Sequence, residues 1–321
     1  MTEQPSPEPI RPPDPHGALA AVHFRRSRGW WRIVAAVAIV VAVLALLGRF
    51  TGGDGVVGDH IARVVIDGAI STNRDRLEAL EELAEDDSVT AVIVAINSPG
   101  GTTAGGEELY EALSRLRETK PVVAVVQELG ASAAYMTAIA ADHILARRLS
   151  IVGSIGVLYQ HVDAGKLMDT IGINLDKVAS GPLKAEPDFN EPLTGPARES
   201  IAALVNDSFE WFVDVVAERR GLPRPQALAL SDGRIVTGRM ALTSGLIDAI
   251  GSEPEAVEWL MAERGIAEDL ELVTAWPKPD QGLGWLGALI SGQARAALGL
   301  PPAGAIALDG LVSLWQVDPA S

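Results

Sequence analysis

The sequence predicts an α/β protein in which a mostly parallel β-sheet is covered by helices. Three β-branched runs have the length of strands, at residues 61–66, 89–96 and 121–126. Turn residues and a helical pattern follow each run, at about 74–86, 105–118 and 133–141, with apolar side chains at i, i+3 and i+4. This alternation is typical of parallel strands joined by helices. No internal repeat is visible, so one folded unit is expected.

A later helix is expected to begin near Thr194, with Pro196 in its first turn, and to end before Gly221. One face of it is apolar, so we expect it to pack on the sheet or on a neighbouring subunit. That face carries Ile201, Leu204, Val205, Phe209, Phe212 and Val216.

The N-terminal part of the chain predicts a membrane anchor. Residues 1–28 form a basic tail, rich in proline and polar residues, that we expect to be disordered. Residues 29–49 are predicted to span a membrane, because the run 33–47 carries no charge and Arg32 can reach the headgroups. A buried core helix and a cleaved signal peptide are the alternatives; the arginines before the run and the lack of a small-residue cleavage site favour the anchor.

The remaining boundaries follow from composition. Residues 50–59 are a glycine-rich linker, residues 60–275 form the folded domain, and residues 276–321 are an apolar extension. The extension has no apolar stretch long enough for a second span, so we expect it in subunit packing or at the membrane surface. The positive-inside rule places the N-terminus in the cytoplasm and the domain on the other side of the membrane.

Composition excludes several classes of site and partner. The chain has no cysteine, which rules out disulfides, thiolate zinc sites and a cysteine nucleophile. The net charge is −16, and residues 1–49 carry six arginines against three acidic side chains, so the rest of the chain has a net charge of −19. Because phosphate binding needs clustered cations, nucleic acid is not an expected partner.

Ser132 is the candidate nucleophile. It follows the strand predicted at 121–126 after a short loop and stands where a helix would begin, so free N–H groups there favour developing negative charge. A small core or capping residue is the alternative interpretation. The surrounding Gly130-Ala131-Ser132-Ala133-Ala134 approximates a nucleophile elbow, which would require a later acid and histidine. After Ser132 only His143 and His161 occur, so a serine–histidine–acid triad is not expected.

A lysine could take the serine proton instead. The chain has five lysines against 21 arginines, and Lys184 lies in an irregular Ser-Gly-Pro-Leu-Lys-Ala loop after a strand-like stretch at 175–178. A solvated loop lysine is the alternative. A lysine acts as a base only when neutral, which requires a pKa well below the ordinary value of about 10.4.

Three further segments could support such a site. Ser154, in a Gly-Ser-Ile-Gly turn, could hold a lysine amine, although it could equally fill a tight turn. Gly100 and Gly101 follow Pro99 at the end of a predicted strand and could donate backbone N–H groups to an oxyanion, with the Ala133 N–H as a second donor. A phosphate-binding loop is excluded because no Gly-Lys-Ser/Thr follows.

Taken together, these segments resemble the signal peptide peptidase A family of membrane-anchored serine proteases over about residues 60–260. Six motifs in order carry the resemblance: Asn97-Ser98-Pro99-Gly100-Gly101, Lys120-Pro121-Val122-Val123-Ala124, Ala131-Ser132 with Tyr135, Val152-Gly153-Ser154-Ile155-Gly156, Ser180-Gly181 with Lys184, and Gly245-Leu246-Ile247-Asp248. The resemblance implies the Clp-protease/crotonase fold of repeated β-β-α units. It makes Ser132 the nucleophile, Lys184 the general base, Ser154 the residue that positions the lysine and Gly100 an oxyanion donor.

The same resemblance implies a ring-shaped homo-oligomer in the bacterial inner membrane, with its catalytic domain on the periplasmic side. Its substrates would be residual signal peptides or other membrane-associated polypeptides, cleaved through an acyl-enzyme, and no cofactor or metal is expected. A crotonase-type acyl-CoA enzyme and an inactive membrane scaffold remain alternatives.

Two positions depart from the family pattern. Ala133-Ala134 stand where the family has Gly-Gly, so a positive φ there would be strained. Ala185-Glu186 follow the lysine, where the family commonly has aspartate next.

Overall fold

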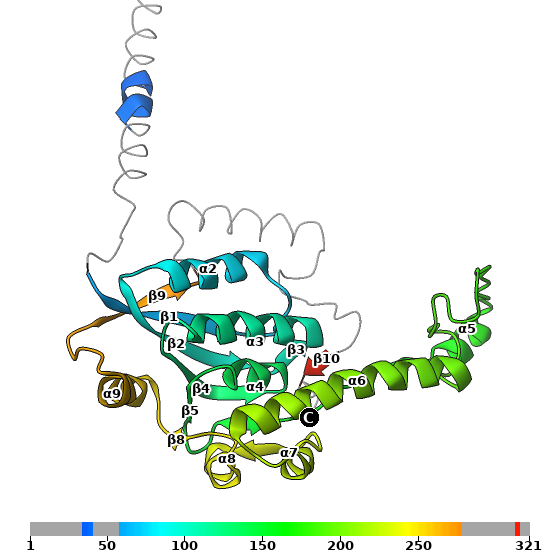
Figure 1. Ribbon diagram of the computed structural model, residues 1–321. Helices are drawn as coiled ribbons and strands as arrows, with labels where there is room; N and C mark the ends of the chain where they lie inside the picture. The colour runs from blue at the N-terminus through cyan, green and yellow to red at the C-terminus, as the bar shows by residue number, and fades with distance from the viewer. Residues whose placement is uncertain (1–33, 41–57, 278–311, 315–321) are drawn as a thin grey trace, which may run out of the picture. The chain divides into compact units, whose positions relative to one another are not determined.

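The computed structural model describes residues 34–40, 58–277 and 312–314 (Figure 1). Residues 34–40, within the predicted anchor, are helical and exposed. In the described ranges no helix has the length and apolar character needed to cross a bilayer. The predicted tail 1–28, the rest of the anchor 29–49, most of the linker 50–59 and most of the extension 276–321 lie outside these residues.

A sheet of eight strands organises the domain. Its main path is β7-β6-β4-β2-β1-β9, and β5 pairs with both β4 and β8. The pairs are parallel except β6 with β7, which confirms the predicted mostly parallel sheet. The strands are β1 (His60–Asp67), β2 (Val89–Ser98), β4 (Val122–Ala131), β5 (His143–Ala146), β6 (Ile151–Gly153), β7 (Ile235–Thr237), β8 (Ala249–Ile250) and β9 (Glu271–Trp276).

The central strands are buried on both faces, as expected for parallel strands that read as continuous apolar runs. Alternate side chains of β1 and β2, such as Val64 and Val94, face a core shared with α2 (Arg74–Glu85), α3 (Thr103–Arg117) and α4 (Ala133–Ala138). The intervening side chains, such as Ile61 and Ile93, face α9 (Glu253–Arg264). Figure 1 shows α2, α3 and α4 side by side over one face of the sheet.

Strand β4 is longer than predicted. It continues to Ala131 because its edge pairs twice, first with β5 at Val123–Val126 and then with β6 at Leu129–Ala131. The short loop expected before Ser132 is therefore absent, and the residue leaves the strand directly into α4. This is a correction to the sequence prediction, and it fixes the nucleophile candidate to the sheet.

The long helix α6 (Gly195–Arg220) has the predicted ends, with Thr194 at its N-cap, proline in its first turn and Gly221 in the left-handed conformation at its C-cap. Only the C-terminal part of its apolar face is buried. Phe212 and Val216 are fully buried, whereas Leu204 is 51% exposed. The last two turns of α6 therefore dock on the domain, together with α7 (Arg224–Leu230) and α8 (Gly238–Ser244).

Residues 158–194 form a segment that we call the arm, which contains α5 (Gly165–Ile171). The hydrogen bonds recorded for residues 161–191 join residues within the arm, such as His161 with the Glu191 carbonyl and the Ala164 N–H with the Phe189 carbonyl. Residues 175–178 are irregular and exposed, so the strand-like stretch predicted there is wrong. Figure 1 shows α5 beside the N-terminal end of α6, whose opposite end packs against the domain.

Candidate active site

Ser132 lies at the junction of β4 and α4, at the carboxyl end of a central parallel strand. It is the N-cap of α4, its φ is 58° and its ψ is −121°, and it is 1% exposed. Its N–H donates to the Gly153 carbonyl at 2.8 Å, and its carbonyl accepts from the Met136 N–H at 3.0 Å. The helix start predicted at Ser132 is confirmed. A serine in this conformation costs about 1–3 kcal/mol, and such strain is concentrated at functional sites.

Strand pairing brings the other predicted segments to Ser132. Ala131 pairs with Gly153 in β6, and Gly130 pairs with Ser98 at the end of β2. Ser154 is buried, its φ is 50°, and its N–H donates to the Arg234 carbonyl at 2.8 Å. The predicted nucleophile, the second serine and the glycine loop therefore meet at one edge of the sheet.

Gly100 and Gly101 begin the short strand β3 (Gly100–Thr102), which lies against Ile70. The Gly100 carbonyl accepts from the Ile70 N–H at 2.8 Å, and the Gly100 N–H donates to Ser98 Oγ at 3.1 Å. A Cβ on Gly101 would lie 1.8 Å from the Ile70 carbonyl oxygen, so only glycine fits there. This close contact alone explains why glycine is required at position 101, whether or not its N–H donates to an oxyanion.

The other edge of β3 carries a strand from the far end of the chain. β10 (Val312–Leu314) pairs antiparallel with β3, with Ser313 opposite Gly101 and Leu314 opposite Gly100. An extended segment can thus lie along the backbone next to the glycine loop, which the sequence analysis did not predict.

Ala133 and Ala134 are helical and fully buried, and neither has a positive φ. The backbone strain expected at these alanines is absent, and the positive φ falls on Ser132 instead. The Ala133 N–H is the first of α4, where helical N–H groups have no partner within the helix. Ala133 also contacts α3, since a Cβ on Gly106 would lie 3.0 Å from the Ala133 Cβ.

Lys184 belongs to the arm. It is in an irregular turn, its N–H donates to the Gly181 carbonyl at 3.1 Å, and it is exposed. The predicted loop is confirmed, but an exposed arm is a different environment from the buried junction that holds Ser132. The arm also has exposed apolar side chains, among them Val162, Leu167, Ile171 and Phe189.

Within the described residues, the arm holds one group of carboxylates close enough to share a metal ion: Glu186, Asp188 and Glu191. The Lys177 ammonium already binds two of them, Glu186 and Asp188. Hydrogen bonds to Asp188 and Glu186 raise the pKa of Lys177, so this lysine is protonated and unsuited to act as a base.

Comparison with known proteins gives the family. The model of peptidase family S49 matches residues 114–267. The slr0021 protein of Synechocystis sp. is 36% identical over 223 residues, which cover 68% of this chain and 80% of that protein. The chain belongs to peptidase family S49. The resemblance to the signal peptide peptidase A proteases is thereby confirmed, and the S49 domain is that of a serine protease.

Two other relatives are longer. The chloroplastic serine protease SPPA of Arabidopsis thaliana is 32% identical over 56% of this chain and 27% of its own length. Protease 4 of Haemophilus influenzae is 30% identical over 62% of this chain and 30% of its own length. The chain therefore spans less than a third of each of these two relatives.

Among solved structures, the comparison finds a mutant of the 1510-N membrane-bound stomatin-specific protease, with a TM-score of 0.48 and 14% identity over 69% of this chain and 99% of that one. A ClpP1 mutant from Listeria monocytogenes has a TM-score of 0.40 and 18% identity over 59% of this chain and 91% of that one.

The sequence did not predict the residues that fix α4 on the side away from Ser132. Arg219 and Arg220, in the last turn of α6, bind the end of α4 and the 245–248 segment. The motifs at Tyr135 and at Gly245–Asp248 were visible as a resemblance, but their common contact depends on tertiary packing.

Proposed function

We propose that this S49 protein is a membrane-anchored serine endopeptidase of the Clp-protease/crotonase fold that uses a Ser132/Lys184 dyad. The observation that carries the proposal is the backbone at Ser132, held at positive φ between a central parallel strand and a helix start. Ligands of parallel α/β sheets bind at the carboxyl ends of the strands, and a sharp strand-to-helix turn presents a nucleophilic side chain there.

The reaction requires a base for the serine. Neutral Lys184 would take the Ser132 proton, the alkoxide would attack the scissile carbonyl, and the same lysine would then protonate the leaving amine and activate water. Ser154, next to Ser132 through the Gly153 contact, would hold the lysine amine. The N–H groups of Gly100 and Ala133 would stabilise the oxyanion; Gly100 would exchange its bond to Ser98 for one to the substrate.

The pairing of β10 with β3 supports a polypeptide substrate. An extended chain added to a sheet edge is held by main-chain hydrogen bonds that do not depend on its sequence. β10 makes this arrangement along Gly100–Thr102, so a substrate strand of the same direction would pass beside the proposed oxyanion donors.

The position of Lys184 supports a dyad formed between copies of the chain. A general base must come within about 2.6–3.2 Å of the proton that it removes, whereas Lys184 lies exposed on the arm. The arm is apolar at its surface, and such surfaces mark contacts with other proteins. In a ring-shaped homo-oligomer, the arm of one copy would deliver Lys184 to Ser132 of the next.

A serine-directed acylating probe tests the mechanism. The detergent-solubilised protein should be labelled at Ser132, and Ser132→Ala should lose both labelling and peptide cleavage. Lys184→Ala should lose cleavage by at least about a hundredfold, the lower range for general-base catalysis, while its unfolding temperature stays that of the wild type. Full peptide cleavage by either variant would refute the dyad.

The same probe separates the alternatives. A crotonase-type acyl-CoA enzyme would hydrolyse or isomerise acyl-CoA and remain unlabelled at Ser132. An inactive scaffold would show neither activity, and a strain carrying Ser132→Ala would behave like the wild type.

The location is part of the proposal and rests on residues 29–49. We propose a single span in the bacterial inner membrane, with the N-terminus in the cytoplasm and the domain in the periplasm, acting on residual signal peptides or other membrane-associated polypeptides. Alkaline phosphatase fused after residue 277 should be active. An inactive fusion would place the domain in the cytoplasm.

A further inference from the structure

Two motifs of the sequence that have no assigned role, at Tyr135 and at Gly245–Asp248, contact each other in the structure. Tyr135 lies three residues after Ser132, in α4, and is fully buried. Its hydroxyl donates to the Leu246 carbonyl at 2.8 Å, and burial raises its pKa, so the hydroxyl keeps its proton. This bond ties the helix that begins at Ser132 to a segment more than a hundred residues later.

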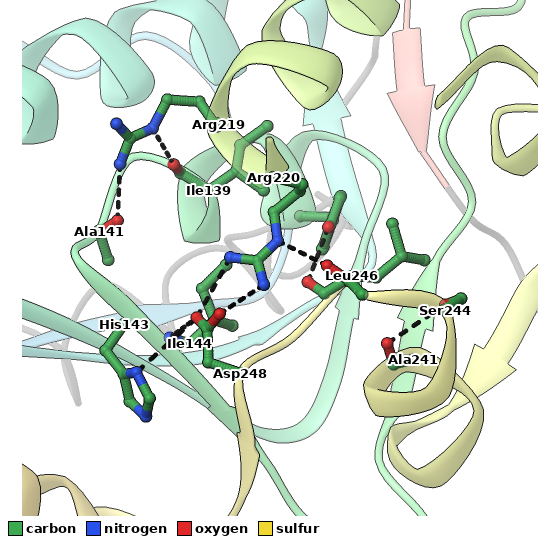
Figure 2. A network of polar contacts seen from close by, with 12 residues as sticks. Ile139, Ala141, His143, Ile144, Arg219, Arg220, Ala241, Ser244, Leu246 and Asp248 are labelled. Carbon is green, nitrogen blue, oxygen red and sulfur yellow. Dashed lines mark hydrogen bonds and ion pairs between the residues drawn. The ribbon is translucent and has the colours of Figure 1, made fainter. Parts of the chain in front are cut away.

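The acceptor of that bond is itself fixed (Figure 2). Arg220 donates through Nε to the Gly245 carbonyl at 2.8 Å and binds the Asp248 carboxylate at 2.6 and 3.1 Å. Asp248 also accepts from the Ile144 N–H in β5 at 2.8 Å. The 245–248 segment is therefore held between α6 and the sheet and gives the Tyr135 hydroxyl a rigid partner.

Arg219 binds the chain at the C-cap of the same helix and just after it. Its guanidinium donates to the Ile139 carbonyl at 2.7 Å and to the Ala141 carbonyl at 2.8 Å, as Figure 2 shows. The last carbonyls of a helix have no partner within it and carry partial negative charge, so a cation stabilises them. Two adjacent arginines of α6 thus fasten α4 directly and through the Tyr135 acceptor.

We infer that Tyr135 and Arg219 are positioning residues for Ser132. Helix α4 has only six residues, too few to be stable by itself, so its tertiary contacts, together with the sheet pairing of Ala131, decide how its N-cap Ser132 is aligned. Attack by Ser132 Oγ requires alignment with the scissile carbonyl, and a small displacement of a reacting group lowers the rate steeply. Removing the contacts that Tyr135 and Arg219 make therefore lowers the rate of acylation of Ser132 without changing peptide binding along β3. The inference rests on the proposed role of Ser132.

Tyr135→Phe is the principal test, because it removes one hydroxyl and keeps the ring that fills the core. Loss of one buried hydrogen bond contributes on the order of 1 kcal/mol, so we expect kcat and the rate of probe acylation to fall about fivefold, with KM unchanged. Ser231→Ala is the matched control, since it also removes one buried hydroxyl-to-carbonyl hydrogen bond, to Ala227 at 2.7 Å at the end of α7, and it should retain wild-type kcat.

Arg219→Gln is the second variant, with Arg224→Gln as its control because the Arg224 ion pairs are exposed. We expect a larger fall in kcat for Arg219→Gln, partly restored in Arg219→Lys, which keeps the charge at the end of α4. Rates are measured below the unfolding temperature of each variant.

The inference is overturned if Tyr135→Phe is acylated at the wild-type rate, or if KM rises with kcat unchanged. It is also overturned if the Tyr135 and Arg219 variants lose activity only in proportion to their loss of folded protein. Failure of the proposed function differs, because the wild type itself would then show no labelling at Ser132.

Discussion

Ser132 and Ser154 adopt conformations that cost serine free energy and would suit glycine. Their φ values are 58° and 50°, and residues other than glycine pay about 1–3 kcal/mol in such sparsely populated backbone conformations. The pairing of Ala131 with Gly153 holds both segments in place, so neither serine can relax without breaking the sheet edge. Serine at such positions agrees with the roles proposed for the two hydroxyls, and the neighbouring alanines remain unstrained.

This strain predicts that Ser132→Gly separates stability from activity. The variant should unfold at a higher temperature, with a free energy of unfolding about 1 kcal/mol greater, because glycine adopts positive φ at no steric cost. Peptide cleavage should be lost. Ser132→Ala is the matched control, since it also loses cleavage but keeps a Cβ at positive φ, and thermal unfolding compares the two. Equal stability of the glycine and alanine variants would contradict the strain argument.

Among the elements, β3 has two different edges: one packs closely on Ile70, and the other pairs with β10, which a substrate strand would replace in the proposed mechanism. On one side, Gly101 packs so closely on Ile70 that no side chain fits, and on the other side β10 supplies the partner strand. The glycines were identified from the sequence as possible oxyanion donors. The pairing with residues 312–314 was not, because strand pairing between distant segments leaves no local pattern.

If β10 occupies the edge that a substrate needs, weakening it should favour substrate. In antiparallel pairs alternate residues point toward the partner, so of Ser313 and Leu314 one directs its N–H to β3. The double variant Ser313→Pro with Leu314→Pro should therefore lower KM for a peptide substrate by roughly severalfold, since a tethered competitor acts at a millimolar effective concentration. The double alanine variant keeps both N–H groups and should retain the wild-type KM. An unchanged KM in the proline variant would show that β10 and substrate do not compete.

For the whole molecule, only one of the two residues of the proposed dyad, Ser132, lies in a buried environment within the described residues. Ser132 is buried beside Ser154, whereas Lys184 is exposed on an arm whose recorded hydrogen bonds are internal. The N-terminal half of α6, which leads to the arm, also leaves apolar residues such as Leu204 exposed. Both features favour an assembly in which these surfaces are covered.

A dyad formed between copies predicts that two inactive variants restore each other. In a mixed ring of Ser132→Ala and Lys184→Ala, some interfaces place an intact Ser132 beside an intact Lys184. An equal mixture, unfolded and refolded together, should regain about a quarter of the wild-type activity for random assembly around a heterologous interface. Each variant refolded alone is the control. No recovery in mixed rings of confirmed composition would mean that each dyad forms within one chain.

The sequence by itself determined the three central strands, the main helices, the family and the candidate residues of the proposed site. These follow from local patterns: apolar periodicity, glycine and proline at turns, the absence of a late histidine, and six motifs in order. Tertiary structure decided the extension of β4 to Ala131, the location of strain, the contact of Tyr135 with Leu246 and the exposure of Lys184 on the arm while Ser132 is buried. Such features depend on which distant segments pair and pack, and pairing between residues far apart in the chain is not encoded in the order of their neighbours.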